Sequence, residues 1–100
     1  MINISFKKKD NHINYVKIKG HANYADEGFD IVCASVSSIA ITTINAIVRI
    51  DLESIVYRDD DGLLEIGIVK IDDIVDILIE NMISMLEELE KQYKDYIKIK

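Results

Sequence analysis

The segment that decides the fold is IVCASVSSIAITTINAIVRI, residues 31–50. It is rich in Ala, Val and Ile, with Ser and Thr interspersed, and its apolar spacing fits a helix that is apolar on most sides. A helix of this kind exposes little polar surface to water. The segment therefore predicts a central, largely buried helix around which the rest of the chain packs.

The residues on either side of this helix alternate between apolar and polar side chains, as strands do. Before it, INISFK (2–7) and INYVKIKG (13–20) are joined by a short connection, which predicts a hairpin. After it, ESIVYRDDDGLLEIGIV (53–69) holds two β-rich runs around Gly62, which can take the positive φ of a tight turn. A second hairpin is expected there.

Towards the end of the chain the apolar residues recur every three or four positions, which predicts an amphipathic helix that covers a sheet. These residues are Ile71, Ile74, Val75, Leu78, Met82, Met85, Leu86 and Leu89. Asp72 and Asp73 favour a helix start at this point, and YIKIK (96–100) can add a last strand. The predicted order is ββαββα(β), an α+β two-layer sandwich with an antiparallel-rich sheet packed against two helices.

Composition limits the organisation and the partners. A chain of 100 residues with 49% hydrophobic and 30% charged residues is expected to form one domain, residues 1–100. The net charge of −6 argues against direct binding of nucleic acid and favours a basic partner. The N-terminus lacks the pattern of a signal peptide, and charged residues or Asn interrupt the longest apolar stretches. We expect a cytoplasmic protein without membrane contact.

Cys33 is the single cysteine, so it is either a small buried apolar residue or a chemical group. A second cysteine for CxxC redox chemistry is absent, and the spacing of His21, Cys33, Asp26 and Asp30 matches no structural zinc site. No metal or other cofactor is expected. His12 is interpreted as a solvated loop residue.

His21 follows the second predicted strand, and Cys33 falls in the first turn of the predicted central helix. The loop between them, Ala22 to Phe29, can fold the two side chains together. A helix N-terminus and a neighbouring imidazolium both stabilise a thiolate. The unpaired amides of Cys33 and Ala34 would then suit an oxyanion. Nucleophile, base and oxyanion donors would share one corner.

The neighbouring residues have two interpretations each. Asp30 is either the helix N-cap, which is the favoured alternative, or the group that orients His21. Ser37, one turn after the cysteine, either bonds near the thiol or satisfies a helix carbonyl. Gly20 and Gly28 bracket the mobile loop as hinges or as ordinary turn residues.

The segments GHANYADEGFDIVCASVS (20–37) and IAITTINAI (39–47) resemble the signature of the ribosomal-processing cysteine proteases. That signature runs from Gly-His through Gly-x-Asp-Ile-Val-Cys-Ala to a Ser four residues after the Cys. Ser35 stands where a second small alanine is usual. The resemblance implies that Cys33 is the nucleophile and His21 its general base, with Asp30 and Ser37 at supporting positions.

The resemblance also implies a substrate and an assembly. The substrate would be the N-terminal extension of large ribosomal subunit protein twenty-seven, cut next to apolar aromatic residues before that protein joins the ribosome. Family members are similar in pairing as homodimers. Ile77, Ile79 and Ile83 of the second predicted helix leave room for such an interface, or belong to the core.

Two other classes of function remain open from the residues. The first is a non-catalytic module that binds ribosomal proteins or assists assembly, with Cys33 only packing and His21 only capping a loop. The second is a cysteine hydrolase of another acyl substrate. The first predicts an unreactive thiol, and a panel of small thioesters and esters would separate the second from a peptidase.

Overall fold

The computed structural model describes residues 1–20 and 27–100, with side chains left out for 27–29. The described elements are β1 (Ile2–Lys9), β2 (His12–Lys19), α1 (Glu27–Ile50), β3 (Ile55–Asp60), β4 (Leu63–Ile68), α2 (Asp73–Gln92) and β5 (Ile97–Ile99). The order ββαββαβ confirms the predicted α+β fold, including the optional last strand.

The strands form one mixed sheet in the order β3-β4-β2-β1-β5. Three pairings are antiparallel, β1 with β2, β2 with β4 and β3 with β4. The last strand instead lies parallel to the first, with Ile2 opposite Ile97 and Ile4 opposite Ile99. Because the two hairpins meet through β2 and β4, and β5 pairs with β1, the strands β4, β2 and β1 lie in the interior of the sheet.

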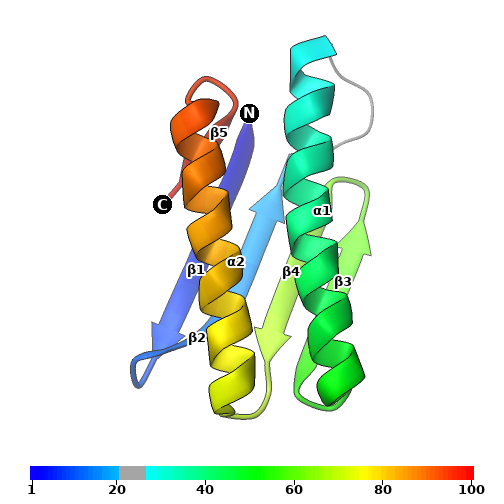
Figure 1. Ribbon diagram of the computed structural model, residues 1–100, viewed down its shortest axis with the longest axis vertical. Helices are drawn as coiled ribbons and strands as arrows, with labels where there is room; N and C mark the ends of the chain where they lie inside the picture. Colours follow the sequence, from blue (N-terminus) through cyan, green and yellow to red (C-terminus); the bar gives the residue numbers. More distant parts are fainter. Residues whose placement is uncertain (21–26) are drawn as a thin grey trace.

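Both helices cover the same face of this sheet (Figure 1). Side chains alternate along a strand, so every second residue points into the space under the helices. Ile2 and Ile4 of β1, and Val16 and Ile18 of β2, are buried there. They pack with buried side chains from the other strands and from both helices in one core. The opposite face of the sheet carries no helix among the described elements.

Helix α1 begins earlier than predicted, at Glu27, and ends at Ile50. It is also more apolar than the sequence analysis allowed. By length and composition alone, its part Asp30–Ile50 is able to cross a membrane, with a mean hydropathy of 2.0. The core helix of a soluble domain meets the same criterion, and Val36, Ala40 and Ile47 of α1 are fully buried in the core.

Helix α2 starts at a defined cap. The Asp72 carboxylate accepts hydrogen bonds from the amides of Ile74 and Val75, which occupies two of the unpaired donors of the first turn. The prediction for the isoleucines is corrected in part. Ile79 and Ile83 belong to the core, whereas Ile77 is 64% exposed. The helix therefore has an apolar inner side and some apolar side chains facing outward.

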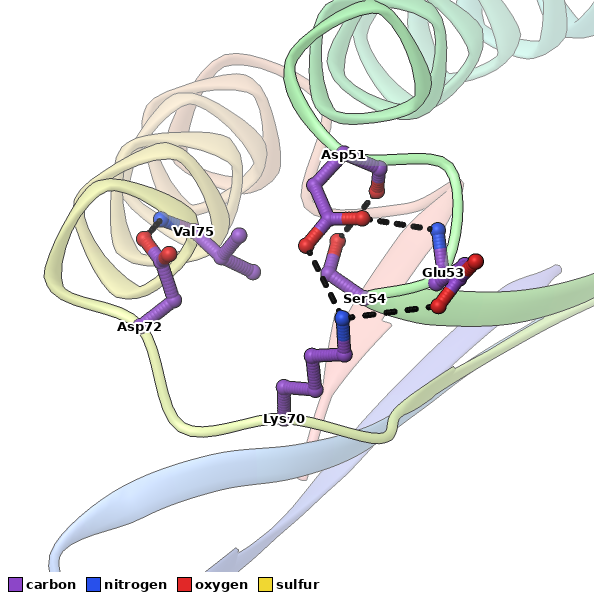
Figure 2. Close-up of polar contacts among 6 residues, drawn as sticks. All are labelled: Asp51, Glu53, Ser54, Lys70, Asp72 and Val75. Atoms are coloured by element: carbon purple, nitrogen blue, oxygen red, sulfur yellow. Dashed lines mark hydrogen bonds and ion pairs between the residues drawn. The ribbon is translucent and has the colours of Figure 1, made fainter.

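A polar turn joins the end of α1 to both strands of the second hairpin (Figure 2). The Asp51 carboxylate accepts from the Glu53 amide at 3.0 Å and pairs with the Lys70 ammonium at 3.3 Å. These two donors, the amide foremost, hold the pKa of Asp51 below its usual value. The hydroxyl of buried Ser54 donates to the Asp51 carbonyl at 2.7 Å. The backbone carbonyl of Ser54 accepts from the Val69 amide at 2.8 Å.

His12 is not a solvated loop residue. It is the first residue of β2, its side chain is half-buried, and its Nδ1 lies 2.5 Å from the Asp76 carboxylate of α2. The sequence analysis missed this pair because Asp76 is 64 residues away in the chain. The contact fastens the first hairpin to the first turn of α2, where an acidic residue is also favoured by the helix dipole.

Gly20 closes the far end of β2 with a conformation that other residues rarely adopt. Its φ is +99°, and its amide donates to the Gly62 carbonyl at 2.8 Å. A Cβ built on Gly20 would lie 2.6 Å from the carbonyl oxygen of Met1. Both the backbone angle and the close approach of another backbone therefore require glycine here.

We expect Gly20→Ala to lower the free energy of unfolding by roughly 2 kcal/mol, because the methyl group meets backbone in a strained conformation. Urea unfolding followed by circular dichroism measures the loss. Gly67→Ala is the matched control, since Gly67 has no positive φ and its added Cβ comes closest to a side-chain methyl of Val56, at 3.1 Å, with the nearest backbone atom at 3.9 Å. Equal unfolding midpoints for the two variants would contradict this account.

Candidate active site

Cys33 lies on the inner side of helix α1. It is 4% exposed and belongs to the hydrophobic core, between Val32 and the next turn at Val36. The helix spacing places Ser37 one turn further along, half-buried. The thiol is thus a packed core group in this conformation, as a lone cysteine often is. Chemistry at this atom requires access that the described residues do not provide.

The early start of α1 changes the predicted surroundings of the thiol. Cys33 is the seventh residue of the helix, in its second turn, and Asp30 is the fourth. The interpretation of Asp30 as the N-cap is therefore wrong. Amides beyond the first four donate to carbonyls four residues earlier. The sequence analysis expected the amides of Cys33 and Ala34 to be unpaired and available to an oxyanion. Within the helix, these amides donate to backbone carbonyls instead.

The described neighbours of Cys33 favour the protonated form of its thiol. Burial raises the pKa of Cys33, the negative charge of Asp30 one turn earlier raises it further, and the positive α-amino group of Met1 acts in the opposite direction. Burial disfavours any charged form. The described neighbours thus oppose a thiolate, and the predicted stabilisation of the thiolate by His21 lies outside the described residues.

His21 and the loop up to residue 26 lie outside the described residues. The structure does fix where this segment starts and ends. Gly20 is held between Met1 and Gly62, and α1 resumes the described chain at Glu27. The predicted loop to Phe29 is three residues too long, because Glu27, Gly28 and Phe29 already belong to the helix. Gly20 is therefore a fixed anchor directly before the histidine.

Sequence reasoning missed the chain start as part of this region. Met1 lies against Gly20, and its α-amino group acts on the thiol of Cys33. A hollow of about 480 Å³ opens beside it, over the end of α2 and the start of β5. The hollow is lined by Met1, Glu90, Lys91, Lys94, Ile97 and Lys98. The approach of Met1 to Gly20 follows from the β1–β2 register, in which Asn3 lies opposite Lys19. The hollow itself depends on the packing of β5 beside β1, which leaves no local sequence signal.

Within residues 1–20 and 27–100 the structure contains no group of three or more His, Cys, Asp or Glu side chains that could hold a metal ion. His21 and Asp26, two of the candidates considered from sequence, lie outside that part. The expectation of a reaction without metal or other cofactor stays a prediction.

Comparison with known proteins shows which family the chain matches. The family described as cysteine protease Prp matches residues 1–98. The ribosomal processing cysteine protease Prp of Bacillus subtilis is 31% identical, over 93% of this chain and 89% of its own. The matched residues include the whole segment from Gly20 to Ser37.

Solved structures agree with this in fold. The Prp protease from S. aureus in complex with a substrate peptide superposes with a TM-score of 0.92 at 27% identity, covering 100% of this chain and 98% of the other. The same protease with a covalently linked product peptide gives a TM-score of 0.87 at 28% identity, covering 99% and 97%. The chain therefore belongs to the Prp family of ribosomal processing cysteine proteases.

Proposed function

We propose that this protein removes the N-terminal extension of large ribosomal subunit protein twenty-seven in the cytoplasm, before that protein joins the ribosome. Cys33 is the nucleophile and His21 the general base. The proposal rests on the family, on the Gly-His and Asp-Ile-Val-Cys segments of residues 20–33, and on the acidic charge of −6, which suits a basic ribosomal protein.

The observation that carries the proposal is the placement of the single cysteine within the family match. The S. aureus relative has been solved with a covalently linked product peptide, which requires a nucleophile on that protein. Cys33 is the one thiol available for such a bond in this chain. It lies in a helix that follows the histidine segment by a few residues.

The reaction is an acyl transfer in two halves. The Cys33 sulfur attacks the scissile carbonyl while its proton moves to His21, and His21 then protonates the departing amine as the C–N bond breaks. The new N-terminus leaves, and a thioester links the extension to Cys33. A water molecule, deprotonated by His21, attacks this thioester; the proton returns to the sulfur, and the carboxylate product is released.

The buried thiol limits how this reaction begins. A thiol with a raised pKa gives little thiolate at neutral pH, so a resting ion pair with His21 is not expected in this conformation. Proton transfer from Cys33 to His21 then accompanies attack, once substrate has opened a path to the sulfur.

The supporting residues have narrower roles in this proposal. Asp30 is exposed on the first turn of α1, where its carboxylate is available to orient the imidazolium of His21. Ser37 lies one turn beyond the thiol and contributes a hydroxyl on the same side of the helix. Gly28 lies in the first turn of α1 and allows that turn to unwind as a hinge.

We expect the parent protein to cut a peptide spanning the extension at a single bond, detected by mass spectrometry. Cys33→Ala and His21→Ala should lower the rate by about 10³-fold or more, because each removes a group that takes part in the chemical step. His12→Ala is the matched control, since His12 pairs with Asp76 of α2 and has no part in the proposed site.

The same experiment tests the non-catalytic alternative, which the buried, protonated thiol favours. A binding or assembly module would hold the peptide without cutting it, and Cys33→Ala would leave that binding unchanged. An intact peptide under reducing conditions, with the parent protein folded, would decide for the module. If Gly28→Ala left the rate of cleavage unchanged, Gly28 would not act as a hinge.

The state of the thiol has its own test. We expect the rate of alkylation of Cys33 by iodoacetamide to be slow at pH 7 and to rise with pH through a pKa above that of N-acetylcysteine, measured beside it. The direction follows from burial, which disfavours the thiolate, and from the Asp30 charge. Fast alkylation near pH 6 would instead indicate a preformed thiolate and would contradict the concerted proton transfer.

We also propose that the protein works as a homodimer through the outer side of α2. Ile74, Ile77 and Met85 are 53%, 64% and 48% exposed. They lie close to one line on the helix, because positions three, four or eight apart fall on the same side. A shallow hollow of about 280 Å³ adjoins Met85, lined on the α1 side by Thr42 and Ile39. A two-fold axis beside α2 would bury these residues against their own copies.

Light scattering after size-exclusion chromatography tests the dimer. The parent protein should elute with the mass of two chains and Ile77→Lys with the mass of one, because the charge would be buried at the interface. Val56→Lys is the control, since Val56 is 63% exposed on β3, away from the helices. A parent protein with the mass of one chain would contradict the proposal.

A further inference from the structure

The face of the sheet opposite the helices is uncovered among the described elements (Figure 1). Its residues follow from the register. Val16 and Ile18 are buried under the helices, so Tyr15, Lys17 and Lys19 of β2 point to the open side. Lys7 of β1 lies opposite Tyr15 and shares that side. We call Lys7, Tyr15, Lys17 and Lys19 the lysine face.

Charge is segregated between helix α2 and one part of the sheet, strands β2, β1 and β5, whereas β3 and β4 carry Asp59, Asp60 and Glu65. Strands β1, β2 and β5 are adjacent and hold six of the 12 basic residues, with no Asp or Glu. Helix α2 on the other layer holds six acidic residues and one basic residue. The net charge of −6, from which the sequence analysis argued against nucleic acid, therefore conceals a basic surface.

A shallow hollow of about 380 Å³ adjoins the lysine face. It forms because Gly67 lies between Tyr15 and Val56 in the sheet and has no side chain to fill the space. The hollow is lined by Tyr15, Val56, Tyr57, Arg58, Glu65 and Gly67. It combines aromatic side chains, a guanidinium group and a carboxylate within one small surface.

Polar groups of both signs surround the Tyr15 ring. The Lys7 ammonium lies 5.4 Å from the ring centroid, and the Tyr15 hydroxyl donates to Glu65 at 2.5 Å, which fixes the ring. Aromatic rings on an exposed sheet, next to cations that reach phosphates, are the means by which single-stranded nucleic acids are bound without a groove.

Other occupants fit less well. A second copy docked by the same face would place the lysines of both copies near the two-fold axis, where like charges repel. The acidic α2 of another copy would make a head-to-tail contact that does not close. An acidic peptide would satisfy the lysines and leave the hollow beside Tyr15 unused. We propose that the lysine face and the Gly67 hollow bind single-stranded RNA.

Fluorescence anisotropy with a labelled 12-nucleotide oligouridylate tests the proposal, with the full chain in low salt. We expect the logarithm of the binding constant to fall with the logarithm of salt concentration with a slope of about −2, from three phosphate contacts. Lys17→Glu with Lys19→Glu should weaken binding roughly tenfold or more. Lys91→Glu with Lys94→Glu changes the same charge elsewhere and should have a clearly smaller effect.

The contribution of base stacking on Tyr15 to RNA binding is measured separately. Tyr15→Leu should weaken binding roughly fivefold or more, while Tyr15→Phe keeps the ring and should retain most of it. Three results would overturn the proposal: no binding of the oligouridylate, equal competition by oligoglutamate of the same charge, or equal losses in the two lysine pairs. The peptide-cleavage assay is independent of all three results, so the RNA surface and the protease activity stand or fall separately.

Discussion

The burial of helix α1 against the sheet is the constraint on which the rest depends. The helix is apolar along nearly its whole length, so it is stable only with a sheet on one side and α2 beside it. This packing also takes Cys33 into the core. The candidate nucleophile, Cys33, is therefore held by the same contacts that stabilise the fold. A reaction at its sulfur would require the first turns of α1 to move.

The sequence predicted the elements well because their patterns are local. Alternation in β1 and β2, the Gly62 turn and the Asp72 start of α2 all appear where they were expected. The start of α1 was misplaced because Gly28 and Asp30 favour a loop or a cap in isolation, whereas the structure continues the helix through them. Tertiary packing overrode local preference at that point.

The contacts that no local pattern predicts are those between distant residues. The pairing of His12 with Asp76 and the parallel contact of β1 with β5 both depend on the final arrangement. For the candidate site, the motif identified Cys33 and the start of the histidine segment. The burial of the thiol and the direction of its pKa shift arise from neighbours that the motif does not contain, so only the three-dimensional structure shows them.

The sheet also has two edges, and each is protected against pairing with another chain. β5 is three residues long, which leaves few free backbone groups to extend. β3 ends in Arg58, Asp59 and Asp60, and charged side chains along an edge oppose the approach of a second strand. The two edges of the sheet thus oppose fibrous aggregation, although the chain is rich in isoleucine and one face of the sheet is uncovered. The interior strands remain available for function.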